Sequence, residues 1–383
     1  MESTGPAIFD IGFVLLLAAL GGWAARRLGL PAVLGYLAVG IIVSPFTPGY
    51  VTDRHQLQIF ADVGVVLLLF EVGIEIDPLK IGRERARLFF LAPVQVIVTG
   101  VLTGVAALIA GLRPAGALLV GLCLALSSSV VVVNITRSRR RTTDLKTDQA
   151  MLGWSVVQDM VGVALAIAAV IALGLDGRSA GDALELALLY IVLVVAVTAL
   201  VPRLLRALRQ EHDLFLIFSV ASALALAGVG AAVFGIPLAL AAFVSGLALT
   251  ESREAAEARE RLLPFRDLFA VLFFVAMGAL IDPGALRNGL RWLAALLALL
   301  ILTKLVPVYL LARFGRLPGR ALQIAIGLGQ IGEFSFVLAT IAVAHNLIRG
   351  DLYAAILASV VVSIAASTVL VRLVRAPAVA TAT

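Results

Sequence analysis

The chain has 383 residues, of which 61% are hydrophobic and 14% are charged, and its mean hydropathy is +1.07. The interior of a water-soluble globule cannot hold so many apolar side chains, so lipid is the expected solvent. The net charge of +6 does not indicate nucleic-acid binding, because the basic residues lie between apolar runs, where they act as topology signals. One cysteine and three histidines argue against a disulfide framework, a resident metal site and a metal cofactor.

Thirteen segments are apolar enough to cross about 30 Å of hydrocarbon, although several are short. The first segment follows Glu2 and Asp10 rather than a basic stretch, so we expect a retained span and not a cleaved signal peptide. The sequence predicts an all-α polytopic membrane protein with about 13 transmembrane helices in a single domain over residues 1–383. The predicted spans are 7–25, 31–44, 57–76, 88–111, 115–136, 148–173, 183–202, 213–232, 236–250, 267–281, 291–312, 321–344 and 351–371.

Loop charges predict the orientation of these spans. With the N-terminus outside and the C-terminus cytoplasmic, most Lys and Arg residues fall in the inside loops, as cytoplasmic loops require. The stretch RSRRR (Arg137 to Arg141) is predicted to anchor the topology, and the run Glu251 to Arg266, with i,i+4 charge pairs, to form a solvated cytoplasmic helix. We therefore expect a multi-pass protein of the cell (inner or plasma) membrane.

An internal repeat runs through the chain at an offset of 206 residues, or 205 for one of the motifs. An odd number of spans separates the copies, so the second copy is inverted in the membrane. Inverted-topology repeats are typical of secondary transporters, whose binding site lies near the bilayer midplane. We expect repeat one over residues 7–173, a linker helix over 183–202 and repeat two over 213–371. The matched residues are Gly29 and Gly235, Pro31 and Pro237, Gly40 and Gly246, Gly73 and Gly278, Gly121 and Gly327, and Ser129 and Ser335.

Two charged residues lie deep within apolar spans. Asp159, beside Gln158, is about eleven residues from its helix start and thus near the bilayer centre. An acid there costs roughly 2.5–3.5 kcal/mol, so it is retained for function or because it is paired. Lys304 lies about thirteen residues into its own span, and we expect the two to form an ion pair. Such a pair can be purely structural, but the repeat counterparts Ala365 and Val98 carry no charge, which favours function.

A buried carboxylate that water reaches from one side at a time can exchange a proton for a cation. The two ligands compete for Asp159, and Gln158 can add a neutral carbonyl oxygen suited to a monovalent cation. If Lys304 stays charged, one carboxylate implies one-for-one exchange. If Lys304 releases its proton in each cycle, transport becomes electrogenic.

Two matched segments are predicted to break within the membrane. ALSSSVVVVN (Ala125 to Asn134) and GLGQIGEFSF (Gly327 to Phe336) are rich in serine and glycine, which also mark close helix packing. Their equivalent positions in the two repeats favour unwound helices whose ends form an ion site. Glu71, deep in another span, has no partner that the sequence identifies. The residues expected to contribute to the site are Ser128, Ser129, Gly329, Gln330, Gly332 and Glu333.

These motifs resemble the membrane domain of Kef-type potassium/proton antiporters, within the monovalent cation:proton antiporter superfamily. The resemblance rests on LLLFEVGIEIDP, ALSSSVVVV, SVVQDMVGVAL, LFFVAMGALIDP and GLGQIGEFSFVLA, which stand in the family's order. It implies a homodimer with a dimerisation domain and a mobile core, an elevator-like motion, and Asp159 as the ion-binding acid. The Gln158–Asp159 pair is similar to Kef proteins and favours K⁺ over Na⁺.

The chain departs from the family in two places. The serine-rich break usually ends in Ser-Thr-Ala, whereas Ser128, Ser129 and Val130 stand here. Full-length Kef proteins also carry a nucleotide-binding regulatory domain after the membrane domain. The sequence given ends at Thr383, so we expect any regulation to need a separate subunit.

The sequence thus predicts a secondary antiporter that exchanges K⁺ or Na⁺ for protons, with membrane lipid and a second copy of itself as partners. A cation channel or uniporter on the same scaffold is the alternative. An intramembrane enzyme is disfavoured because the sequence has no HExxH motif and no Ser–His dyad.

Overall fold

The structure is a computed structural model that describes residues 5–44, 54–75, 87–137, 142–175, 177–249 and 253–374. Within these ranges all regular elements are helices, and nine helical segments are long and apolar enough to cross a membrane; two of them, Pro114–Thr136 and Leu290–Phe314, are made of consecutive shorter helices. Three shorter apolar helices accompany them in the same described ranges. The predicted all-helical membrane class is confirmed, while the number of thirteen spans stays a prediction.

Each predicted span overlaps one or more helices of the described chain. The predicted spans 115–136 and 321–344 are each divided into two helices, as expected for segments that break. The helices are α1 (Gly5–Arg27), α2 (Ala32–Ile42), α3 (Arg54–Glu75), α5 (Leu88–Ile109), α6 (Pro114–Ala125), α7 (Ser129–Arg137), α8 (Leu145–Ala172), α9 (Ala180–Ala207), α10 (His212–Ala232), α11 (Leu238–Leu249), α12 (Arg253–Ala279), α13 (Pro283–Asn288), α14 (Leu290–Leu299), the π-helix η1 (Leu300–Leu305), α15 (Val306–Phe314), α16 (Ala321–Leu328), α17 (Phe334–Ala344) and α18 (Gly350–Leu373).

Some predicted features lie outside the described residues. These are the part of RSRRR beyond residue 137, the GIEIDP motif beyond residue 75, and residues 251–252 of the predicted cytoplasmic helix. The rest of that helix is continuous with the following span, since α12 begins at Arg253 and ends at Ala279. Its predicted i,i+4 pair between Glu257 and Arg261 is present, at 2.6 Å.

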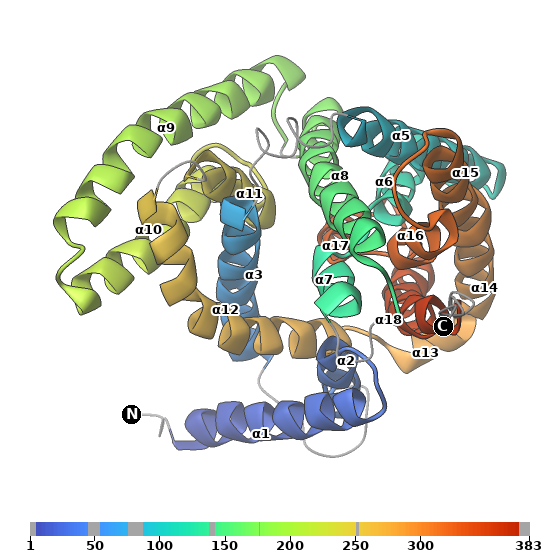
Figure 1. Cartoon of the computed structure of the whole chain (residues 1–383), viewed down its shortest axis with the longest axis horizontal. Coiled ribbons are helices and arrows are strands. Elements are labelled where there is room, and N and C mark those ends of the chain that lie inside the picture. Colours follow the sequence, from blue (N-terminus) through green and yellow to red (C-terminus); the bar gives the residue numbers. More distant parts are fainter. Residues whose placement is uncertain are drawn as a thin grey trace, which may run out of the picture. The chain divides into compact units, whose positions relative to one another are not determined.

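The chain forms two compact units. Unit 1 comprises Met1–Leu20, Tyr36–Leu79 and Ile167–Leu280, and unit 2 comprises Gly21–Gly35, Lys80–Ala166 and Ile281–Thr383. In unit 1, α3 packs along both α11 and α12 (Figure 1). In unit 2, α5 packs against α6, and α17 packs against α6 and α18.

Four glycines allow the helices of unit 1 to approach closely. A β-carbon added at any of them would overlap a main-chain oxygen of the neighbouring helix. The contact between Gly40 and Gly278 corresponds to the contact between Gly246 and Gly73, once the repeat offsets are applied. The glycines and the overlapped oxygens are Gly40 and Val275, Gly278 and Leu37, Gly246 and Phe70, and Gly73 and Phe243.

The turns before α2 and α11 are also alike. Gly29 and Gly235 both take a positive φ, 82° and 70°, in the left-handed region that favours glycine. Each is followed two residues later by the proline that precedes the helix. Equivalent backbone turns at the predicted offset support the internal repeat.

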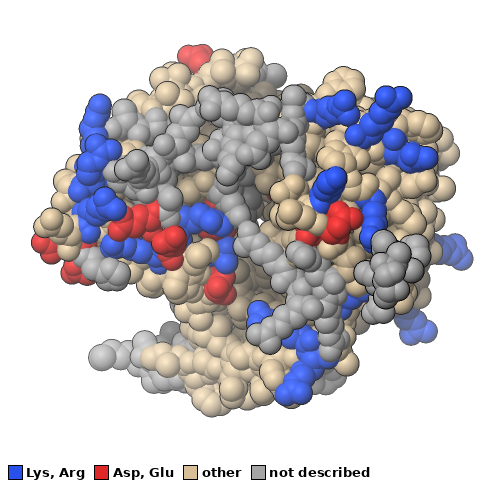
Figure 2. Space-filling model, viewed as in Figure 1, with Lys and Arg blue, Asp and Glu red and all other residues tan. Residues whose placement is uncertain are grey.

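Uncharged side chains cover much of the surface in the view of Figure 2, and charged side chains gather in separate groups. Many exposed large apolar residues lie along long helical segments, for example Leu188 and Val192 on α9 and Ile301 and Leu302 within the segment Leu290–Phe314. A surface of this kind is suited to lipid acyl chains.

Asp144 marks the start of α8, outside the membrane-spanning part of the chain. Its Oδ1 accepts a hydrogen bond from the Thr147 N–H at 2.8 Å, which is an N-terminal cap. Partial burial opposes ionisation of this carboxyl, but the bonds from Thr147 and the nearby Arg320 outweigh it and hold the pKa of Asp144 below its usual value. The helix that carries Asp159 thus begins at a defined residue.

Candidate functional site

Two helix breaks in unit 2 contact each other. The first separates α6 from α7 at residues 126–128, and the second separates α16 from α17 at residues 329–333. The Ser127 hydroxyl donates to the Leu328 carbonyl at 2.6 Å, and the Gly332 N–H donates to the Leu126 carbonyl at 2.9 Å. A β-carbon on Gly332 would overlap the main chain of Ser127, so this crossing requires glycine.

Two glutamine side chains bond the unwound backbone at the first break. Gln158 accepts the Ser127 N–H at 3.0 Å with its carbonyl oxygen. Gln330 accepts the Ser128 N–H and donates to the Ser128 carbonyl, both at 3.0 Å. Main-chain groups that a break frees in an apolar environment need such partners. The Gln158 oxygen that the sequence offered to a cation is therefore directed at the backbone.

Asp159 lies next to this arrangement, on α8, and is only 1% exposed. Neither of its carboxylate oxygens has a hydrogen-bond partner of good geometry among the described residues, and the same holds for Oε2 of Glu333. The Ser129 hydroxyl is close enough to interact with Asp159, and both Glu333 and Lys304 interact with it electrostatically. Buried carboxylate oxygens without a donor call for a proton or a cation.

Lys304 contacts both breaks. Its fully buried amine donates to the Leu126 carbonyl at 2.8 Å and to the Gln330 carbonyl at 2.6 Å. The direct ion pair that the sequence suggested with Asp159 is not present, because neither carboxylate oxygen of Asp159 has a hydrogen-bond partner among the described residues. The physical reason is that carbonyl oxygens freed at the ends of α6 and α16 carry partial negative charge and attract the amine.

The structure brings together most of the residues predicted for the site. Gly329 directly follows α16 and packs near the Leu305 side chain, so its contribution is to the shape of the break. Sequence reasoning missed Ser127, which crosses to the second break, and Gln95, whose amide bonds Gln158. Gln95 is the one amide side chain in a mainly apolar span, and its depth there is the signal that could have identified it. The predicted residues gathered around the breaks are Ser128, Ser129, Gln158, Asp159, Lys304, Gln330, Gly332 and Glu333.

Glu71, which had no partner in the sequence, is held by two arginines of unit 1. The Arg259 Nε lies 2.5 Å from one carboxylate oxygen, and an Arg266 terminal nitrogen lies 2.7 Å from the other. Glu71 is 1% exposed, whereas the arginine side chains are 30% and 24% exposed. This cluster joins α3 to α12 and leaves neither Glu71 oxygen for a transported ion.

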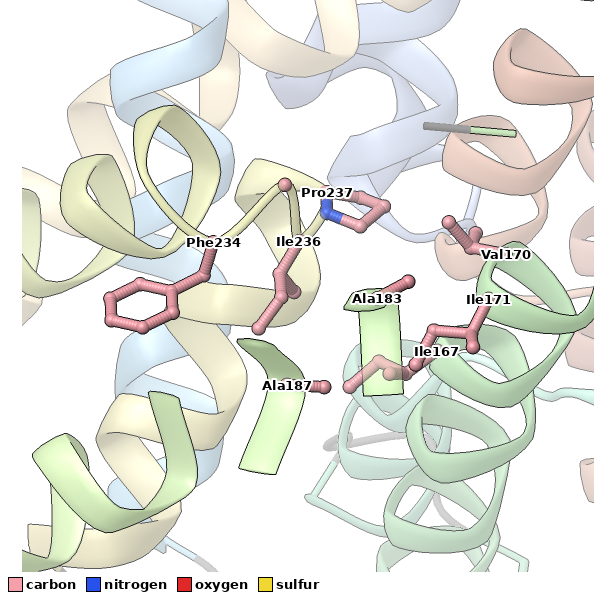
Figure 3. Close-up of a pocket in the computed structure, with 9 residues that line it drawn as sticks. Ile167, Val170, Ile171, Ala183, Ala187, Phe234, Ile236 and Pro237 are labelled. Carbon is pink, nitrogen blue, oxygen red and sulfur yellow. The ribbon is translucent and has the colours of Figure 1, made fainter. Parts of the chain in front are cut away.

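A pocket in unit 1 is lined by apolar residues only (Figure 3). Its side chains come from the end of α8, from α9 and from the connection between α10 and α11, where Ile236 and Pro237 lie. It contains no acid or amide that could bind a cation.

A protein family described as "Sodium/hydrogen exchanger, transmembrane" matches residues 14–376 of the chain. The chain belongs to this sodium/hydrogen exchanger family. The exchanger is 32% identical over 387 residues to the "Putative cation/proton antiporter YbaL" of Escherichia coli (strain K12), across 97% of this chain and 69% of that protein. It is therefore a membrane transporter of the cation:proton antiport class.

The fold of the exchanger is also similar to a solved structure. The sodium proton antiporter MjNhaP1 from Methanocaldococcus jannaschii at pH 8 superposes with a TM-score of 0.73, over 96% of each chain. Sequence identity is 18%, so this likeness concerns the fold. The exchanger's membership of the monovalent cation:proton antiporter superfamily, expected from its motifs, is confirmed at that level.

Proposed function

We propose that the exchanger transports a monovalent cation, K⁺ in preference to Na⁺, against protons, and that both bind at Asp159. The observation that carries this proposal is that neither carboxylate oxygen of a buried aspartate, beside two helix breaks, has a hydrogen-bond partner of good geometry among the described residues. A buried carboxylate with a purely structural role would be paired with donors, as Glu71 is with two arginines in unit 1.

Competition between the two ligands follows from the surroundings of Asp159. An apolar, water-poor environment favours the neutral carboxyl, while a bound cation stabilises the carboxylate. An empty charged site is costly to carry across the bilayer. The carrier therefore moves with either a proton or a cation bound, which couples the two fluxes.

The neighbouring groups suit a cation that has lost part of its water. Glu333 contributes a second carboxylate, whose Oε2 has no hydrogen-bond partner in the described part of the chain, and the Ser129 hydroxyl donates weakly to its Oε1 at 3.5 Å. In this proposal Asp159, Glu333 and Ser129 supply the ligand oxygens. Gln158 and Gln330 hold the backbone, and Lys304 balances the partial negative charge at the helix ends.

The inverted repeat and the K⁺ preference belong to the same proposal. The matched glycine contacts and the matched turns at Gly29 and Gly235 support repeats over residues 7–173 and 213–371, with 183–202 as the linker. The Gln158–Asp159 pair, similar to Kef-type proteins, supports K⁺. We further propose a homodimer in the cell membrane with the N-terminus outside and the C-terminus cytoplasmic.

Exchange can be tested with purified protein in liposomes that contain a pH-sensitive dye. An imposed K⁺ or Na⁺ gradient should change the internal pH with the wild-type protein but not with Asp159→Asn, whose amide cannot exchange a proton. Asp213→Asn, a change of an exposed aspartate on α10, is the matched control and should retain exchange. Running the series across K⁺, Na⁺, Li⁺ and Rb⁺ gives the preference.

The channel alternative predicts a different result in the same liposomes. A channel or uniporter would carry K⁺ or Na⁺ without moving protons, so isotope flux would persist while the dye stayed unchanged. That result would overturn the antiport proposal. Exchange with a preference for Na⁺ would overturn only the assignment of K⁺.

A further inference from the structure

A chain of buried hydrogen bonds in unit 2 connects the first helix break to the helix that carries Lys304. It begins at Gln158, whose amide nitrogen donates to the Ala125 carbonyl at 2.9 Å and to the Gln95 carbonyl oxygen. Gln95 in turn donates to the Ala125 carbonyl at 3.2 Å and to the Thr99 hydroxyl at 3.0 Å. Thr99 donates to the Thr303 carbonyl at 2.7 Å, directly beside Lys304.

The orientation of each side-chain amide in this chain of hydrogen bonds follows from neighbouring N–H groups, which can donate but cannot accept a hydrogen bond. The Trp154 N–H is a donor and points at the Gln95 carbonyl oxygen, at 3.4 Å. The Gln95 nitrogen must then face Thr99 and Ala125, and the Gln158 nitrogen must face Gln95. This leaves the Gln158 carbonyl oxygen for the Ser127 N–H, which is also only a donor.

The far end of the chain is equally constrained. Residue 307 is proline, which lacks the N–H that an α-helix would direct to the Thr303 carbonyl four residues earlier. The helix is π-helical over Leu300–Leu305, a form that often occurs at functional sites. If the nitrogen and oxygen of the Gln95 amide exchanged places, the oxygen would accept the Thr99 hydroxyl hydrogen. The Thr303 main-chain carbonyl would then lose the hydrogen bond that Thr99 donates to it.

We propose that Gln95 is a positioning residue for exchange, because it fixes both the Gln158 amide beside Asp159 and the π-helical turn that presents Lys304. This inference rests on the proposed antiport. Gln95 touches neither Asp159 nor Lys304, so it acts through the groups that hold them. Without the Gln95 amide, the Asp159 carboxylate and the Lys304 amine should no longer be held at a fixed distance from each other. Cation binding should then weaken more than turnover slows.

The test compares Gln95→Leu with Gln323→Leu in liposomes and in detergent. Gln323 is also a fully buried glutamine of unit 2, but its amide bonds the carbonyls of Thr142, Val371 and Val374. We expect Gln95→Leu to raise the apparent KM for K⁺ by roughly tenfold, as loss of a buried hydrogen-bonded group would. It should also shift the pH profile of exchange. Gln323→Leu should leave the KM and the pH profile unchanged.

Trp154→Phe provides a milder variant, since it removes the N–H that orients Gln95 and keeps an aromatic ring. It should raise the KM by roughly threefold, in the same direction as Gln95→Leu. A double-mutant cycle of Gln95→Leu with Thr99→Val should be non-additive in KM, because both changes interrupt one chain. The cycle of Gln323→Leu with Thr99→Val should be additive.

The proposal would be overturned if Gln95→Leu matched Gln323→Leu in KM and pH profile, or if the first cycle were additive. If the wild-type protein showed no cation/proton exchange in liposomes, the proposed antiport itself would be contradicted. In that event the shift in melting temperature caused by K⁺ decides between the variants: a shift that Gln95→Leu alone reduces supports positioning, and equal shifts contradict it.

Discussion

The amine of Lys304 donates to the main-chain carbonyl of Leu126, at the C-terminal end of α6. A second bond to the Gln330 carbonyl joins the same amine to the other break. The lysine thus stabilises the crossing of two unwound segments, in addition to its electrostatic interaction with Asp159. Its contribution to stability can be measured separately from the contribution to transport that is proposed for it.

Lys304→Met should destabilise the protein more than Lys304→Gln does. Methionine fills similar space but leaves the Gln330 carbonyl without its donor, at a cost of about 1–3 kcal/mol for a buried polar group. A glutamine amide can still donate to one carbonyl. Melting temperatures in detergent measure the difference, and Lys146→Met, a change of an exposed lysine on α8, is the control expected to have little effect. Equal melting temperatures for wild type and Lys304→Met would contradict the structural role.

The Glu71 cluster predicts an asymmetry between its partners. Glu71→Gln leaves two arginines that are partly exposed and can be hydrated, so the loss should be small. Replacing both Arg259 and Arg266 with methionine leaves a carboxylate that is 1% exposed, which should cost about 3–5 kcal/mol. Chemical unfolding or thermal melting in detergent measures both.

A matched control for that comparison is the exposed pair between Arg209 and Glu257, which lies at 2.9 Å. The Arg209 side chain is 63% exposed, so Arg209→Met should change stability by only about 0–1 kcal/mol. A loss as large as that of the double arginine variant would show that burial of the acid is not the cause.

The most buried residues of the candidate site could be predicted from the sequence because they interrupt runs of apolar residues. Asp159 and Lys304 are charges in apolar spans, and the serine- and glycine-rich segments mark the breaks at residues 126–128 and 329–333. The partners of these residues could not be predicted in the same way. Lys304 bonds main-chain carbonyls, and a carbonyl has no sequence signature until a helix unwinds around it.

Long-range pairs were missed for a related reason. Arg259 and Arg266 are 188 and 195 residues from Glu71, and their cytoplasmic charge pattern predicted only a solvated helix. Because α12 continues through that helix into the span, the same arginines face a buried acid of α3. Gln95 was missed because one amide in an apolar run is compatible with several neutral roles, until its partners are placed.

The repeat makes a prediction that no single helix contact could make. If Gly40 and Gly246 are equivalent, then Gly40→Ala and Gly246→Ala should destabilise the protein by similar amounts, since each added β-carbon overlaps a main-chain oxygen. Overpacking of this kind costs about 1–3 kcal/mol. Gly228→Ala on α10, where nothing lies within 4 Å of the added carbon, should be neutral or slightly stabilising because alanine favours helix. Melting temperatures in detergent compare the three variants, and unequal losses at Gly40 and Gly246 would count against two equivalent copies.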